Sequence, residues 1–166
     1  MIRHIIVAGA IFALASVSSA GIWIFDDPLN EALVVPPTGV AATGNASGTF
    51  DDVTNLLNIT VLASGFVSPR TSAHVHGPAT PQQNNSVQLI LGVAGDGGDY
   101  NNPFRLHTLS SIQANDFLAG LYYVDIHTED NPAGAIRAQL NPVPEPASMI
   151  ALGIGTLVLL RRRKKL

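Results

Sequence analysis

The sequence contains no cysteine, so it can form neither a disulfide framework nor a thiolate metal site. Any metal ion would have to be held by the five histidines and the carboxylates. Basic residues are also scarce, because residues 21–142 hold only Arg70, Arg105 and Arg137 against eleven acidic residues. Phosphate binding needs a basic face, so this balance argues against a nucleic-acid partner. The G-x-S-x-G elbow of serine hydrolases is absent as well, which leaves hydrolysis without support.

The length of 166 residues suits one domain with additional segments at its ends. Residues 1–20, MIRHIIVAGAIFALASVSSA, have a basic start at Arg3, an apolar run, and small residues at Ser18 and Ala20. This layout is typical of a secretory signal peptide and predicts export with cleavage after Ala20. An N-terminal anchor or a buried helix is the alternative interpretation.

The C-terminal segment begins with a proline-rich stretch and continues with an apolar stretch of 14 residues at 147–160. A helix of this length is roughly 21 Å long and spans the hydrocarbon core only marginally. The basic cluster behind it should stay in the cytoplasm, which places the folded part on the other side of the membrane. The cluster consists of Arg161, Arg162, Arg163, Lys164 and Lys165.

The order of these features resembles a PEP-CTERM sorting signal over residues 143–166. Pro144, Glu145 and Pro146 come first, and the apolar stretch and the arginine cluster follow. The resemblance implies that the tail holds an exported protein at the inner membrane of a Gram-negative bacterium. An exosortase-type transpeptidase would then recognise and process the Pro-Glu-Pro motif and deliver the protein to the cell surface or the extracellular matrix.

The central segment alternates apolar and polar residues, which predicts antiparallel strands. In residues 55–66, for example, Leu57, Ile59 and Val61 fall on one face of such a strand. Similar alternation occurs at 86–93, 121–128 and 134–140, and loops rich in Gly, Asn, Asp and Pro separate these segments. We expect an all-β fold, either an antiparallel β-sandwich or a partly closed barrel.

One short helix is expected within this β domain. Ser110 and Gln113 form a capping-box pair, and Gly120 is a suitable C-terminal stop. The sequence shows no internal repeat. The one extended low-complexity stretch is TGVAATGNASGT, at residues 38–49.

Three blocks in succession resemble the CHRD domain, the module named after chordin. They read LNEALVVPPTGVAATGNASGTF, SAHVHGPA and FLAGLYYVDIHTEDNPAGAIRAQL, within about residues 29–140. The sequence departs from the family pattern at Val34, Ala133, Ala135 and Ala138. The resemblance implies an extracellular β module without an established enzymatic activity. The expected organisation is a signal peptide at 1–20, the β domain at 21–142 and the sorting segment at 143–166.

Histidines in this domain form a candidate metal site. His74 and His76 lie two residues apart in TSAHVHGPATP and therefore share one face of a strand. His127 lies on the non-core side of its own strand beside Asp125, which could orient a ring nitrogen, and His107 could supply a fourth ligand. Such a set suits zinc or copper. A site requires that His127 come within about 4–5 Å of the pair, because each nitrogen must lie near 2 Å from the ion.

Several interpretations of these residues stay open at the sequence level. The His-x-His pair with a distal histidine is similar in outline to the copper site of copper-zinc superoxide dismutase, although that family's bridging loop and disulfide are absent. His74 and His76 could instead bond backbone carbonyls near the Gly77-Pro78 turn. Asp96, Asp99 and Asn101 could bind calcium weakly, and the acidic surface could serve in adhesion.

The leading expectation is a non-enzymatic, exported protein of the cell envelope or extracellular matrix without a cofactor. Its partners would be the inner membrane, an exosortase-type transpeptidase, and a matrix polysaccharide or protein. The alternative is a copper- or zinc-binding domain that uses the histidine cluster.

Overall fold

The structure is a computed structural model that describes residues 21–95 and 100–145. Within these ranges, no helix is long and apolar enough to cross a membrane. The predicted signal helix and transmembrane helix lie outside the described residues. The described elements are β1 (Ile22–Leu29), a 3-10 helix η1 (Glu31–Leu33), β2 (Thr43–Asp51), β3 (Leu56–Ser64), β4 (Arg70–His76), β5 (Val87–Gly95), β6 (Tyr100–Thr108), α1 (Ser111–Leu118), β7 (Tyr123–Thr128), β8 (Ile136–Gln139) and β9 (Val143–Pro144).

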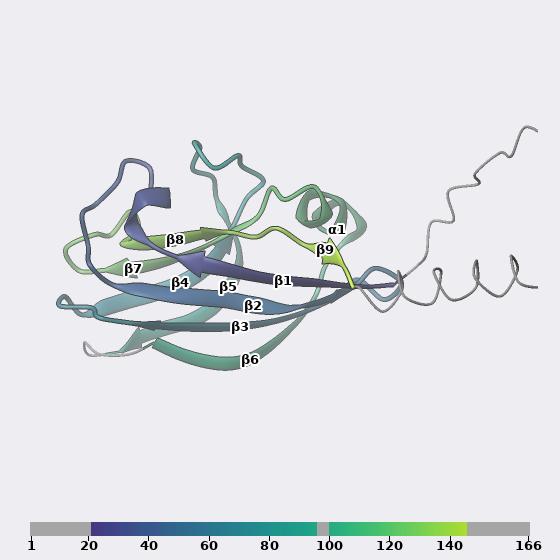
Figure 1. The fold of residues 1–166 in the computed structure, drawn as a ribbon, viewed down its shortest axis with the longest axis horizontal. Coiled ribbons are helices and arrows are strands. Elements are labelled where there is room, and N and C mark those ends of the chain that lie inside the picture. The colour runs from purple at the N-terminus through teal and green to yellow at the C-terminus, as the bar shows by residue number, and fades with distance from the viewer. Residues whose placement is uncertain (1–20, 96–99, 146–166) are drawn as a thin grey trace, which may run out of the picture.

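The strands form two antiparallel sheets that face each other, as Figure 1 shows. The first sheet has the strand order β6-β3-β2-β1-β9, and the second has the order β5-β4-β7-β8. This arrangement confirms the predicted all-β fold with one short helix, and of the two predicted alternatives it is the antiparallel β-sandwich. Strands far apart in the sequence become neighbours, and the most important pair for the site is β4 with β7.

The core lies between the sheets and follows the period-two pattern of the strands. On β3, Leu57, Ile59 and Val61 are fully buried, and on β7 the core positions are Val124 and Ile126. Apolar burial of this kind stabilises a fold by about 25 cal/mol per Å² of surface removed from water. The sequence prediction of an inward apolar face is therefore confirmed for these two strands.

Helix α1 closes one end of the core. Its capping box is present, because the Ser110 side chain accepts from the Gln113 backbone and the Gln113 side chain accepts from the Ser110 backbone. Phe117 of α1 packs against the rings of Phe25 and Phe50, with centroid separations of 5.6 and 5.1 Å. Gly120 follows in the left-handed region with φ of 70°, as its predicted role as helix stop requires.

The low-complexity stretch at residues 38–49 contributes to a strand in the middle of the first sheet. β2 pairs with β1 on one side and with β3 on the other. A Cβ at Gly48 would collide with the Asn58 carbonyl and the Phe25 ring, and a Cβ at Gly44 would collide with the backbone of β3. Glycine thus permits close packing here, while its weak strand propensity hides the strand from sequence inspection.

The outer face of the second sheet is covered over β7 and β8. Residues 77–86 and 129–135 fold back over it, so the polar side chains on the non-core side of β7 and β8 are buried. These side chains belong to Tyr123, Asp125, His127, Arg137 and Gln139. The sandwich therefore has a second, polar interior layer, and the histidines lie in it.

Candidate metal centre

The pairing of β4 with β7 brings the histidines together. In this antiparallel register, His74 lies opposite Asp125, His76 opposite Tyr123, and Ser72 opposite His127. Side chains on the same face of neighbouring strands approach each other directly or diagonally. The three imidazoles therefore gather on one patch of the outer face, although 51 residues separate His76 from His127.

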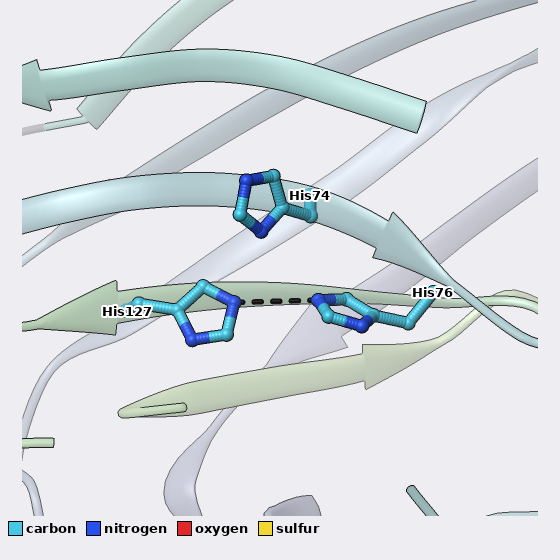
Figure 2. A group of neighbouring side chains, drawn as sticks. All are labelled: His74, His76 and His127. Atoms are coloured by element: carbon cyan, nitrogen blue, oxygen red, sulfur yellow. Dashed lines mark hydrogen bonds between the residues drawn. The ribbon is translucent and has the colours of Figure 1, made fainter. Parts of the chain in front are cut away.

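The ring nitrogens of this patch lie close enough to share one ion. His74, His76 and His127 each offer one nitrogen, and these three atoms all lie within 4.8 Å of one another. The condition that His127 come within 4–5 Å of the pair is met. Figure 2 shows the rings of His76 and His127 facing each other, with one ring nitrogen of His74 pointing toward the gap between them.

Backbone carbonyls fix the orientation of two of the rings. The Nδ1 atom of His76 lies 2.9 Å from the carbonyl oxygen of Asn85, and Nδ1 of His127 lies 3.1 Å from that of Pro132. A carbonyl can only accept, so each Nδ1 carries a hydrogen and donates it. In a neutral ring the Nε2 atom is then the acceptor, with its lone pair free for a metal ion.

These two Nε2 atoms lie 3.3 Å apart, the contact drawn as a dashed line in Figure 2. A hydrogen bond between them requires that one ring be doubly protonated. Burial lowers the pKa of His76 and lowers the pKa of His127 to about 4. At neutral pH both rings are therefore uncharged, and two lone pairs face each other in the protein without a metal.

A cation would relieve this unfavourable contact. Nitrogens bound to Zn²⁺ at 2.0–2.1 Å in tetrahedral geometry are separated by about 3.3–3.4 Å, which agrees with the 3.3 Å between the Nε2 atoms of His76 and His127. His74 contributes a buried Nδ1 that has no hydrogen-bond partner among the described residues. His74 is half-buried, so an ion could enter from its side, and three imidazoles leave one coordination position for water.

His107 does not join the cluster, and Asp125 does not orient a ring nitrogen as predicted. His107 lies on β6 in the first sheet, opposite Leu57, whereas the cluster belongs to the second sheet. The ring nitrogens predicted to contact Asp125 are bound by the Asn85 and Pro132 carbonyls instead. Of the residues suggested as calcium ligands, Asp96 and Asp99 lie outside the described residues.

Asp125 is the most unusual charge near the histidines. Its side chain is 3% exposed, and its Oδ1 atom lacks a hydrogen-bond partner within the part of the chain that the structure describes. Burial raises the pKa of Asp125 to about 8, and the nearby Arg137 guanidinium opposes this shift. A cation bound by the adjacent histidines would favour the ionised carboxylate.

Sequence reasoning missed the groups that orient the rings. The acceptors for His76 and His127 are the main-chain carbonyls of Asn85 and Pro132, which any residue type could supply. It also missed Tyr123, whose ring stacks on His76 at a centroid distance of 5.1 Å and an interplanar angle of 13°. One available signal was position, because Tyr123 shares the alternate face of β7 with His127.

Comparison with known families identifies two regions of the chain. A family model for the CHRD domain matches residues 25–140, which is more than half of the chain. The chain belongs to the CHRD domain family. A second family model, the PEP-CTERM protein-sorting motif, matches residues 142–164. The chain is thus a CHRD domain protein with a sorting signal that an exosortase recognises at the membrane during export. Comparisons with curated proteins and with solved structures found no match.

Proposed function

We propose that this CHRD domain is an exported metal-binding module that holds one zinc or copper ion on His74, His76 and His127. The observation that carries the proposal is the pair of Nε2 atoms 3.3 Å apart, each on a ring that is oriented by a hydrogen bond at its other nitrogen. Ligating histidines in proteins are commonly oriented in this way. The proposed role is binding rather than catalysis, in keeping with the expectation of a non-enzymatic protein.

The structural interpretation of the histidines uses other atoms of the same rings. The Nδ1 bond of His76 ties β4 to Asn85 in the segment 77–86 that covers the sheet, which stabilises the fold with or without an ion. Metal binding uses the Nε2 atoms of His76 and His127. The two roles are therefore compatible, and they can be separated by a substitution that keeps the first nitrogen and removes the second.

Asparagine is that substitution, because its amide nitrogen occupies nearly the position of Nδ1. His76→Asn and His127→Asn keep a donor for the Asn85 and Pro132 carbonyls but lack Nε2. His107→Asn is the matched control, since His107 lies on the other sheet. Each protein would be purified without a histidine tag, stripped with a chelator, and titrated with Zn²⁺ and Cu²⁺ by calorimetry.

The wild-type domain and His107→Asn should each bind about one equivalent of metal. The two cluster variants should lose at least about 100-fold in affinity while their urea unfolding midpoints stay close to wild type. Equal binding by all four proteins, or no stoichiometric binding by the wild type, would refute the metal site.

We further propose that the sorting signal delivers the domain to the cell surface or extracellular matrix of a Gram-negative bacterium after removal of a signal peptide. Matrix polysaccharide or protein would be its partner there. The PEP-CTERM match supports this destination, since the motif belongs to exported proteins processed at the membrane. Deletion of residues 144–166 should release the protein from the membrane fraction. Unchanged fractionation would contradict the assignment.

A further inference from the structure

The first two residues of the Pro-Glu-Pro motif are part of the folded domain. β9 (Val143–Pro144) pairs antiparallel with β1, with Pro144 opposite Trp23 and Val143 opposite Ile24. The Glu145 amide then donates to the Ile22 carbonyl at 2.9 Å. Figure 1 shows β9 lying along β1 at the edge of the first sheet. The sorting motif is therefore docked on the sheet and is not a free tail at this point.

The strand that β9 docks on is firmly held. Asp52 accepts from the Gly21 amide at 2.8 Å and from the Trp23 indole at 3.0 Å. β1 is also paired along all eight of its residues with β2. The hydrogen bonds between β1 and β9 should therefore break before those between β1 and β2.

β9 itself is held weakly. It has two residues, both exposed, and a strand this short with exposed hydrogen bonds opens at low free-energy cost. Glu145 and Ile22 form a hydrogen-bonded pair, so Pro144 occupies the next, non-hydrogen-bonded position, where its missing N–H is not needed. Upstream, Asn141 is tied to Asp27 by two bonds of 2.9 Å, one from its backbone amide and one from its side chain.

We propose that β9 is a latch, and that the exosortase-type transpeptidase processes this chain only after β9 has left β1. An enzyme that acts on a peptide segment must bind the backbone of that segment in its own cleft, and here β1 already occupies the same backbone groups. The rate of processing then scales with the fraction of chains in which β9 is open. This proposal rests on the PEP-CTERM sorting assignment and is independent of the metal site.

A disulfide between β1 and β9 tests the latch. Ile24 and Val143 are direct register partners. Hydrogen-bonded antiparallel partners have Cα atoms about 5.5 Å apart, within the range that a disulfide spans. The native chain has no cysteine, so Ile24→Cys with Val143→Cys gives a single possible bond and leaves Pro144, Glu145 and Pro146 intact. The full chain would be expressed in a host that carries an exosortase, where the exported compartment is oxidising.

Thiol alkylation and gel mobility would distinguish chains with the disulfide, called locked chains here, from chains with free thiols. Loss of the tail would report processing. Locked chains should be processed at least about 10-fold more slowly than wild type, and either single-cysteine variant should match wild type. Asp27→Ala, which removes both ties to Asn141, should be processed faster than wild type. Processing of locked chains at the wild-type rate, or no acceleration in Asp27→Ala, would overturn the latch. Failure of the wild-type chain to be processed at all would instead refute the sorting assignment.

Discussion

The guanidinium carbon of Arg137 lies 3.5 Å from the ring centroid of Tyr123, and the Tyr123 ring also stacks on His76. Arg137 is completely buried. It donates to the carbonyls of Thr80 and Gln83 at 3.1 and 2.9 Å. One arginine thus connects β8, the covering residues 77–86 and the Tyr123 ring beside the candidate metal ligands.

Arg137→Lys should destabilise the domain strongly. A lysine ammonium cannot reproduce the planar fork that bonds Thr80, Gln83 and Gln139 at once, so buried acceptors lose their partners. We expect a loss of about 3 kcal/mol in the free energy of unfolding, measured by urea titration of the metal-free protein. Arg105→Lys is the control, because Arg105 is exposed, and it should change stability by less than about 0.5 kcal/mol. Equal effects of the two substitutions would contradict the assigned role of Arg137.

Gly134 should tolerate alanine less well than Gly39, although both have positive φ. Gly134 has φ of 129°, and a Cβ there would collide with the Asp125 carboxylate, whereas Gly39 has φ of 73° and open space around it. Gly39→Ala then costs backbone strain of about 1 kcal/mol, and Gly134→Ala adds a steric clash for a total of about 3 kcal/mol. Thermal and urea unfolding of the two variants would measure the difference. A smaller loss for Gly134→Ala than for Gly39→Ala would show that the carboxylate moves freely.

The sequence predicted which face of each strand carries the histidines. It could not predict that the two faces lie side by side. Period-two alternation places His74 and His76 on one side of β4 and His127 on the non-core side of β7. Whether these faces meet depends on the pairing of β4 with β7, a contact between segments about 50 residues apart that no local pattern encodes. The ring-orienting carbonyls of Asn85 and Pro132 are invisible for a different reason, since every residue has one.

The sequence allowed strands to be predicted where alternating side chains pack into the core. It did not allow this where glycines let the backbones pack closely. β3 and β7 carry branched and aromatic residues at alternate positions, and their alternation predicted both strands. β2 packs through Gly44 and Gly48, which leave no apolar pattern to recognise. On β5, Leu91 is buried as predicted, but Val87 is 44% exposed. Register shifts against β4 rotate the end of the strand away from a uniform face.

The metal-free domain should lose stability as pH rises because of Asp125. Burial raises the pKa of this carboxyl from its ordinary value of 3.8 to about 8, so the folded state binds the proton more tightly than the unfolded state. The contribution is fully present below about pH 4 and is lost as pH rises through 8, with an upper bound on the order of 6 kcal/mol. Asp125→Asn has nearly the same shape and does not ionise. Its stability relative to wild type should therefore increase between pH 4 and pH 8 in urea titrations with chelator.

The comparison with Asp125→Asn is necessary because the histidines act in the opposite direction. Burial lowers the pKa of His127 to about 4, so this ring contributes stability above its unfolded pKa of 6.5 that is lost as pH falls toward 4. The difference between wild type and Asp125→Asn cancels that contribution. A difference that stays constant from pH 4 to pH 8 would show that Asp125 ionises normally.

Two adjacent tyrosines offer a matched test of how the cluster is supported. The Tyr123 hydroxyl accepts from the Asn85 amide at 3.0 Å and donates to the Asn85 carbonyl at 3.3 Å, the same carbonyl that orients His76. The Tyr122 hydroxyl is buried without a hydrogen-bond partner in the described residues, and burial raises its pKa to about 12. Tyr123→Phe keeps the ring stack on His76 but releases Asn85, whereas Tyr122→Phe removes an unpaired polar group.

Tyr123→Phe should therefore lower the free energy of unfolding by about 1–2 kcal/mol, and Tyr122→Phe should leave it unchanged or raise it slightly. The same pair separates support of the metal site from general stability. Tyr123→Phe should weaken zinc or copper binding about 10-fold, because Asn85 no longer holds the His76 tautomer as firmly, and Tyr122→Phe should bind as wild type does. Calorimetric titration of the two variants measures this directly. If Tyr123→Phe loses stability but binds metal with wild-type affinity, then Asn85 orients His76 without help from the tyrosine.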